Sequence, residues 1–478
     1  MQVVAGVDSS TQSTKVEMRA VESGRVVGSG SSPHPATTPP RSEQDPGAWW
    51  AAFQRAYDAA LAMAGEQSDD VEVVGISVAG QQHGMVVLDE ARQVVRPAKL
   101  WNDTESAPDA GWLCKQLPGG AADWAAAVGS VPVAAFTVSK LSWLHRSEPE
   151  AWARMAHVVL PHDWLTMQLT GSLTTDRGDA SGTGYWSPAT GEYRWDLLAI
   201  VDSARDWSQV VPRVADPYET VGDWHGIPVA CGTGDNMGAA LGLGLAPGTA
   251  VISLGTSGTA YAVSSGPTAD PTGHVAGFAD ASGGFLPLAC TLNATKVTDT
   301  IGRLLGVTYE QFDQLALAAA PGAGGVTLLP YFDGERTPDL PNATGWICGL
   351  HSDATREQLA RAAVEGVCCS MLDALDAVRQ LSSVERVVLV GGGARSAAYR
   401  QVFASLCDLP VGTADEAEAV ATGACVQAAA VALGESHADI AARWGLGETV
   451  AIHAEPCRQV RDQYAVLRTA ATAAITTP

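Results

Sequence analysis

The sequence predicts an α/β fold built from two related domains. Two segments carry this prediction: residues 3–16 and 250–261 each read as an apolar strand, a tight turn of small hydroxyl and glycine residues, and a second strand. When they are aligned, Thr11 falls on Thr256 and Thr14 on Thr259, 245 residues further along a chain of 478. Such turns leave backbone N–H groups open and add hydroxyl donors, which suits a phosphate chain. Because one opens each half of the chain, the pair predicts twin domains that hold a nucleotide.

Strand-like and helix-like segments alternate along the chain, as they do in α/β proteins. Short Val/Ile-rich runs that often end in glycine predict buried strands at residues 25–28, 71–79, 85–88, 158–160, 227–230, 249–254 and 387–390. Helical patterns fall at residues 46–65, 139–145, 148–155, 295–305, 355–381 and 416–433. Thr355 is expected to be the N-cap of the helix that begins there. Five prolines in residues 28–46 predict a surface loop without regular structure.

The segment Ala246-Pro247-Gly248 interrupts the chain just before the second hairpin. Proline and glycine together mark a break between elements. We therefore expect the domain boundary here, with an N-terminal domain of residues 1–246 and a C-terminal domain of residues 247–478.

Composition indicates an enzyme that acts on small molecules. Asp and Glu number 52 against 29 Lys and Arg, a net charge of −23, which argues against a nucleic-acid-binding surface. We see no secretory signal and no apolar run near the length of a membrane span. Nine scattered cysteines without a C-x-x-C motif predict neither a zinc site nor a disulfide framework. We expect a cytoplasmic protein that binds neither nucleic acid nor membrane, and the sequence does not distinguish a monomer from a homodimer.

Nine short polar motifs are spread along the chain, several of them directly after predicted strands. They are Gly6-Val7-Asp8 with Thr11 and Lys15, Ser42-Glu43-Gln44-Asp45-Pro46, Gly80-Gln81-Gln82-His83-Gly84, Leu100-Trp101-Asn102-Asp103, Leu160-Pro161-His162-Asp163-Trp164, Gly234-Asp235-Asn236, Leu254-Gly255-Thr256-Ser257-Gly258, Gly334-Glu335-Arg336-Thr337-Pro338 and Gly391-Gly392-Gly393-Ala394-Arg395-Ser396. In this order they resemble the FGGY family of carbohydrate kinases, and most closely its members that phosphorylate D-xylulose.

The resemblance covers almost the whole chain and implies both a fold and a reaction. The fold is a pair of actin-like, ribonuclease-H-like ATPase domains with a cleft between them. The reaction is ATP-dependent phosphorylation of D-xylulose to D-xylulose 5-phosphate, with Mg²⁺. Another ketose or polyol, such as L-ribulose, glycerol or gluconate, is the alternative within the family. An actin-like or heat-shock-chaperone-like ATPase module is the alternative outside it.

Two aspartates are the expected catalytic residues. By resemblance, Asp235 is the general base that takes the proton from the attacking sugar hydroxyl, and glycine on both sides of its loop lets a substrate approach. Asp8 ends the first strand and is expected, with Asp235, to hold Mg²⁺, which typically binds through few carboxylates. The structural alternatives are a helix cap for Asp235 and an Asx-turn for Asp8.

Further residues are assigned to the sugar and the nucleotide by the same resemblance. Substrate contacts are expected from Gln82, His83, Trp101, Asp103 and Asn236, which offer hydroxyl partners and an aromatic face. Nucleotide contacts are expected from Thr11, Lys15, Gly255, Thr256, Gly392 and Gly393. The chain departs from the family at Ser10, where glycine is usual.

Overall fold

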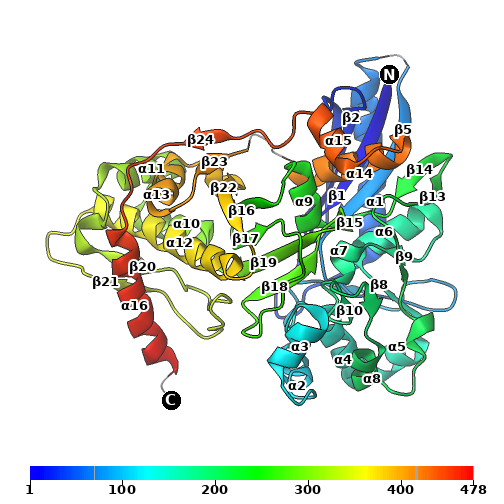
Figure 1. The fold of residues 1–478 in the computed structure, drawn as a ribbon, viewed down its shortest axis with the longest axis horizontal. Coiled ribbons are helices and arrows are strands. Elements are labelled where there is room, and N and C mark those ends of the chain that lie inside the picture. Colours follow the sequence, from blue (N-terminus) through cyan, green and yellow to red (C-terminus); the bar gives the residue numbers. More distant parts are fainter. Residues whose placement is uncertain (69, 415–417, 477–478) are drawn as a thin grey trace. The chain divides into compact units, whose positions relative to one another are not determined.

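The computed structural model describes residues 1–68, 70–414 and 418–476, and the chain divides into two compact units (Figure 1). The first unit comprises Met1–Leu245, Ser265–Leu286 and Glu416–Gly447, and the second comprises Ala246–Ser264, Pro287–Asp415 and Glu448–Pro478. The first break lies next to the boundary expected after residue 246, but two later segments return to the first unit. The division therefore follows packing and is not a single cut in the chain.

The first unit is built on a sheet with strand order β13-β14-β5-β1-β2-β3, in which β15 also pairs with β5. Its strands are β1 (Gln2–Ser9), β2 (Ser13–Ala20), β3 (Val26–Pro33), β5 (Glu72–Gly80), β13 (Thr220–Trp224), β14 (Ile227–Ala230) and β15 (Thr233–Gly234). β1 runs antiparallel to β2 and parallel to β5. The hairpin expected at residues 3–16 is thus the centre of this sheet.

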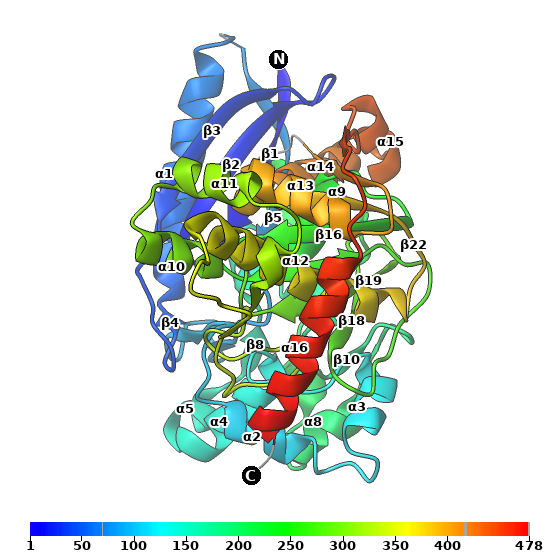
Figure 2. The same ribbon diagram turned by 90° about the vertical axis from the view of Figure 1, so that its left-hand side faces the viewer.

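Both faces of β1 are buried, because helices pack on each side of the sheet. Val3, Ala5 and Val7 belong to a core cluster with residues of α1 (Pro46–Gly65), which packs on β2 and β3 (Figure 2). Val4, on the opposite face, packs with residues of α14 (Ala419–Leu433). The alternation follows from the two-residue period of a strand.

Close packing through glycine explains why α14 belongs to the first unit although it lies far along the chain. A Cβ atom on Gly6 of β1 would lie 2.1 Å from the carbonyl oxygen of Ala421. A Cβ atom on Gly242, at the end of α9 (Asp235–Gly242), would lie 1.9 Å from that of Ala419. Only glycine permits these approaches, so α14 rests directly on β1 and α9 (Figure 1).

The remaining elements of the first unit surround this sheet. They are β4 (Glu43–Gln44), β6 (Val86–Leu88), β7 (Ala98–Lys99), α2 (Ala107–Leu113), α3 (Ala121–Val128), α4 (Thr137–Ser147), α5 (Pro149–Arg154), β8 (His157–Val159), α6 (Pro161–Thr170), β9 (Thr174–Thr175), α7 (Arg177–Ala180), β10 (Trp186–Ser187), β11 (Glu192–Tyr193), α8 (Trp195–Val201), β12 (Arg213–Val214), β18 (Val275–Ala279) and α15 (His437–Arg443).

The second unit repeats the plan of a sheet with helices packed on it. For the strands of this unit the order is β19-β17-β16-β22-β23-β24. Its strands are β16 (Gly248–Leu254), β17 (Gly258–Ala262), β19 (Phe285–Thr291), β22 (Val384–Val390), β23 (Val411–Thr413) and β24 (Val450–Ile452), with a separate pair, β20 (Thr327–Leu329) and β21 (Trp346–Cys348). Its helices are α10 (Thr295–Leu305), α11 (Tyr309–Ala318), α12 (Arg356–Arg379), α13 (Ala397–Leu406) and α16 (Gln459–Thr476). The predicted cap is confirmed, since the Thr355 hydroxyl accepts from the Gln358 N–H at 3.3 Å.

One predicted loop is wrong in part. The prolines predict no regular structure for residues 28–46, yet β3 continues to Pro33 and pairs with β2. The prolines begin only at Pro33, so the preceding residues keep their N–H donors, and Gly28 and Gly30 fit closely against α1. The helix expected at residues 416–433 is described from Ala419, and residues 416 and 417 lie outside the described residues.

Among the helices that the structure describes, none is by itself long and apolar enough to cross a membrane. α14 and α15 reach that length only together, as a pair bent by 112°.

Candidate active site

The sheet of the first unit brings the two expected catalytic aspartates to one edge. β5 lies between β1 and β15, and Ala79 of β5 is the register partner of both Asp8 and Thr233. Asp235 follows Thr233 by two residues and begins α9. Parallel strands therefore end here side by side, which is where ligands bind in open α/β sheets.

Asp8 is a buried carboxylate with an unused oxygen. Its Oδ1 atom has no hydrogen-bond partner among the described residues. Burial raises the pKa of Asp8 to about 7, and the nearby charge of Asp235 adds to this rise, whereas Lys15 opposes it. An oxygen of this kind is suited to a cation, because a divalent ion would compensate the buried charge.

Asp235 is a carboxylate with one oxygen held in place. The backbone N–H of Asn236 and its Nδ2 atom both donate to Asp235 Oδ1, at 2.8 Å and 2.9 Å. Burial raises the pKa of Asp235 to about 6, although the bonds from Asn236 favour the ionised form. The N-cap position of α9 is Gly234 and not Asp235, and the bonds from Asn236 use only the Oδ1 atom of the carboxylate.

The turn after β5 and residue Asn236 form one hydrogen-bonded group. Asn236 Nδ2 donates to Gln82 Oε1 at 2.8 Å, and Gln82 Nε2 has no partner in the described part of the chain. His83 has a left-handed backbone, with φ of 64°, and its ring packs against Phe136 and Phe278. The structure thus brings Gln82 and Asn236 together beside Asp235, with an amide donor still available.

Thr11 joins the first hairpin turn to other motifs. Trp101 Nε1 donates to the Thr11 hydroxyl at 2.9 Å, and this hydroxyl donates to Gln81 Oε1 at 3.0 Å. Gln44 Nε2 donates to the Thr11 carbonyl at 2.9 Å. Trp101 itself is 43% exposed. Motifs from separate parts of the sequence therefore meet at one turn.

Ser10 keeps the hairpin turn without glycine. Its backbone N–H and its hydroxyl both donate to the Ser13 carbonyl at 3.0 Å. Ser10 is not one of the described non-glycine residues that have a positive φ. The turn has no need of glycine's conformational freedom at this position, so the departure from the family leaves the backbone unstrained.

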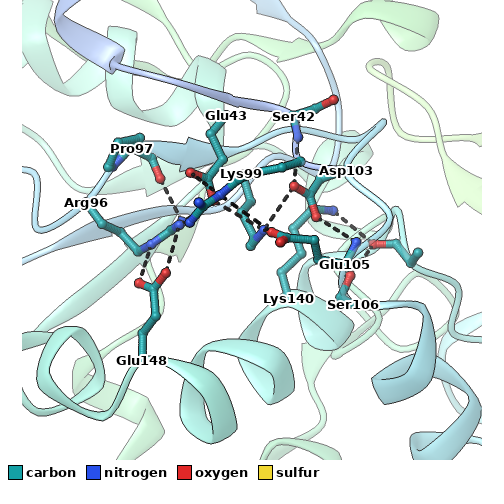
Figure 3. Close-up of polar contacts among 12 residues, drawn as sticks. Ser42, Glu43, Arg96, Pro97, Lys99, Asp103, Glu105, Ser106, Lys140 and Glu148 are labelled. Atoms are coloured by element: carbon teal, nitrogen blue, oxygen red, sulfur yellow. Dashed lines mark hydrogen bonds and ion pairs between the residues drawn. The ribbon is translucent and has the colours of Figure 1, made fainter. Parts of the chain in front are cut away.

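Asp103 is fully buried and lies within an ionic network (Figure 3). Its carboxylate accepts from the Ser42 N–H and from Lys99 Nζ, both at 2.9 Å, and from the Glu105 N–H at 3.1 Å. These donors occupy both of its oxygens, so Asp103 holds the chain around Trp101 in place.

The network extends from Asp103 to charges on other segments. Lys99 also contacts Glu43, and Arg96 joins Glu43 to Glu148. Glu43, Asp103 and Glu105 are close enough to hold a metal ion, but the Lys99 ammonium already stands among them. Lys99, Asp103 and Glu105 are close in the sequence, whereas Glu43 and Glu148 join the network from distant segments that no local pattern links to it.

Lys15 has a partner that no sequence motif predicts. Its Nζ atom lies 2.6 Å from Glu418 Oε2, at the start of α14. Both side chains are 37% exposed, so Lys15 remains accessible at the mouth of the turn. Glu418 lies 403 residues along the chain from Lys15, and no local pattern links them.

The second unit brings its two expected nucleotide loops together. Gly391 and Gly393 both pack on Leu254, the last residue of β16, where a Cβ on either would come within 3 Å of Leu254 atoms. Gly255 and Thr256 follow directly and form the turn to β17, in which Thr256 is exposed. Gly392 has open space around it, since a Cβ there would meet no atom within 4 Å. The two turns are therefore neighbours at one end of the sheet.

Family models and curated relatives point to the same protein family. The N-terminal domain of the FGGY family of carbohydrate kinases matches residues 3–242, and the C-terminal domain of that family matches residues 250–432. The xylulose kinase of Streptomyces coelicolor is 50% identical over 453 residues, covering 92% of this chain and 90% of that protein. The xylulose kinase of Haemophilus influenzae is 36% identical, covering 88% and 89%.

Solved structures agree with these relatives. The xylulose kinase from Bifidobacterium adolescentis matches with a TM-score of 0.85 and 41% identity, over 98% of this chain and 99% of that one. These matches confirm the family and the α/β fold of two actin-like domains that the motifs predicted. The chain belongs to the FGGY family of carbohydrate kinases and is an ATP-dependent sugar kinase.

Proposed function

We propose that this kinase transfers the γ-phosphoryl group of ATP to D-xylulose, giving D-xylulose 5-phosphate and ADP. The observation that carries the proposal is the grouping of Asp235, Asn236 and Gln82 at the end of β5 and β15, in a chain half identical to a xylulose kinase over nine-tenths of its length. The group offers a carboxylate and a free amide donor, which suit a polyhydroxylated substrate.

Asp235 is the general base in this proposal. With a pKa of about 6 it is mostly ionised at neutral pH and is a stronger base than an exposed aspartate. Asn236 holds one oxygen of the carboxylate and leaves the other to accept the proton of the attacking hydroxyl. In a loose phosphoryl-transfer transition state, orientation of that hydroxyl matters more than basicity.

Asp8 and Asp235 are the residues that would hold Mg²⁺. The unpartnered Oδ1 of buried Asp8 and its raised pKa fit a divalent cation. When bound, Mg²⁺ neutralises charge on the phosphates of ATP. Because no described residue donates to Asp8 Oδ1, this oxygen is available to bind the cation.

The remaining assignments divide between sugar and nucleotide. Gln82 and His83 contact sugar hydroxyls, with Asn236 beside them, and Trp101 offers an exposed ring face. Asp103 has its oxygens occupied, so its part in sugar binding is to fix the Trp101 turn. The nucleotide residues are Thr11 and Lys15 in the first unit, and Gly255, Thr256, Gly392 and Gly393 in the second.

The test is ADP release with Mg-ATP, measured with D-xylulose, L-ribulose, D-ribulose, glycerol and D-gluconate, and without sugar. We expect a kcat/KM for D-xylulose well above that for every other sugar. Preference for another sugar would keep the mechanism and overturn the substrate. Equal ADP release with and without sugar would overturn the reaction itself.

A further inference from the structure

A buried ionic cluster lies directly behind the proposed active site. His162, the second residue of α6, is fully buried together with Asp163, Asp176 and Asp179. Its Nε2 atom lies 3.1 Å from Asp163 Oδ1, 3.2 Å from Asp176 Oδ1 and 3.5 Å from Asp179 Oδ2. Asp163 Oδ1, Asp179 Oδ2 and His162 Nε2 have no hydrogen-bond partner in the described chain, so the imidazole and these carboxylates interact as charges at ion-pair distance.

The carboxylates around the His162 imidazole favour its protonated form. Burial alone would lower the pKa of His162, but the three carboxylates outweigh burial and raise the pKa to about 9. A buried carboxylate without a partner is costly, and removal of one member of such a cluster leaves the others uncompensated. Burial also raises the pKa of Asp163 to about 6 and the pKa of Asp179 well above its usual range, so the charge of each member depends on the others.

Two hydrogen bonds connect the cluster to the two turns of the active site. Asp179 Oδ1 accepts from the backbone N–H of His83 at 3.3 Å, and Asp176 Oδ2 accepts from the Thr233 hydroxyl at 2.8 Å. Thr233 precedes Asp235 by two residues. The two aspartates that bind these turns both lie within ion-pair distance of His162 Nε2, Asp176 at 3.2 Å and Asp179 at 3.5 Å.

Glycines bring both turns against the imidazole. A Cβ atom on Gly80, at the start of the substrate turn, would lie 3.0 Å from His162 Cβ. A Cβ atom on Gly232, which has a φ of +79°, would lie 2.9 Å from His162 Nδ1. His162 is thus packed between the turn after β5 and the turn before α9, and a shift of its ring would move both.

We propose that His162 is a positioning residue, which through Asp179 and Asp176 sets the places of the His83 turn and of Asp235. The inference rests on the proposed roles of His83 and Asp235. It goes beyond them because it assigns a task to a motif, Leu160-Pro161-His162-Asp163-Trp164, that has no assigned contact with sugar or nucleotide.

The first test removes one link without disturbing the charges. Thr233→Val keeps the shape of the side chain and loses the donor to Asp176. We expect kcat with D-xylulose to fall about tenfold, as the loss of one buried hydrogen bond at a positioning site would give, with the KM for ATP unchanged. Thr233→Ser restores the hydroxyl and is expected to restore kcat.

The second test changes the cluster itself. Asp179→Asn keeps an acceptor for the His83 N–H but weakens the pairing with His162, and we expect a rise of about fivefold in the KM for D-xylulose. His162→Gln removes the cation, whereas His162→Lys keeps it, so the lysine variant should retain more kcat/KM than the glutamine variant. If His162→Gln does not fold, the Thr233 and Asp179 variants decide the question.

The matched control is a buried ion pair elsewhere. Arg361 Nε and Glu365 Oε1 lie 2.7 Å apart within α12 of the second unit. Glu365→Gln should lower the melting temperature and leave kcat and both KM values at the wild-type level. If Thr233→Val and Asp179→Asn likewise reduce the melting temperature but leave kcat and both KM values unchanged, the cluster is structural and the proposal fails. Asp235→Asn, run in parallel, tests the base separately, because its activity does not depend on the outcome for the cluster.

Discussion

The hairpins β1–β2 and β16–β17 share a shape but not a chemistry. In the first, Asp8 and Lys15 are register partners one position before the last pair of the strands, Ser9 and Thr14. In the second, Ser253 aligns with Asp8 but pairs with Thr259, and Ala260 stands where the first hairpin has Lys15. The two hairpins therefore repeat a backbone shape, while the carboxylate and the ammonium group beside the turn belong to the hairpin of the first unit.

The largest effect is expected from a carboxylate of the first unit, Asp235. Asp235→Asn keeps the shape and the bonds around Asn236 but removes the base, so kcat should fall at least about a thousandfold. Calorimetry should show ATP binding close to wild type, because the nucleotide loops are untouched. The control is Asp58→Asn on the exposed side of α1, which should keep full activity. An active Asp235→Asn enzyme would remove Asp235 from the mechanism.

At Asp8 we expect a substitution to lower activity and, at the same time, to raise stability. Asp8→Asn should lower kcat with Mg-ATP about a hundredfold or more, yet raise the stability of the metal-free protein. The native pKa of about 7 exceeds the unfolded value near 3.8, so the native state holds the proton longer and loses stability as pH rises between these values. The gain from Asp8→Asn is therefore absent near pH 4 and grows to at most about 4 kcal/mol above pH 7.

Thermal unfolding in a chelator at pH 4, 6 and 8 measures this gain. The expected result is a difference in melting temperature between variant and wild type that widens with pH. A difference that stays constant across the three pH values would contradict the buried-charge account of Asp8.

The second unit should respond through its glycines and not through charge. Gly392 has open space around it, so Gly392→Val should fold normally and raise the KM for ATP about tenfold by occupying the nucleotide loop. Gly391 has φ 85° and ψ 176°, a region open essentially to glycine alone, so Gly391→Ala should cost about 1–3 kcal/mol of stability. Kinetics and thermal unfolding of the two variants separate the effects. A normal KM for Gly392→Val would place the nucleotide elsewhere.

The smallest effect is expected at Ser10. Ser10→Gly introduces the residue usual in the family, but the turn is already unstrained. We expect kcat to change less than about twofold and stability to fall by about 0.5–1 kcal/mol, because glycine gains freedom in the unfolded chain. A large gain in activity would show that the serine hydroxyl hinders the first phosphate turn.

Local patterns in the sequence predict much of the fold. The helices expected at residues 46–65 and 295–305 match α1 and α10 residue for residue, because their apolar spacing and their ends are local signals. The hairpin turns and the strands before Asp8 and Asp235 can also be predicted from the sequence, since strands that end in glycine and hydroxyl residues indicate an open turn. The extent of β3 to Pro33 could not be predicted in this way, because the five prolines of residues 28–46 suggest a loop, and the packing of Gly28 and Gly30 on α1 is not a local signal.

By itself the sequence determined the family, the two hairpins and the residues with reactive side chains, all of which depend on near neighbours in the chain. Only the tertiary structure decided which charges meet. Glu418 reaches Lys15 across 403 residues, the N–H of Ser42 reaches Asp103 across 61 residues, and Asp176 and Asp179 meet His162 from another segment. A buried charge must find its partner in space, and the free energy that demands this pairing leaves no fixed spacing along the chain.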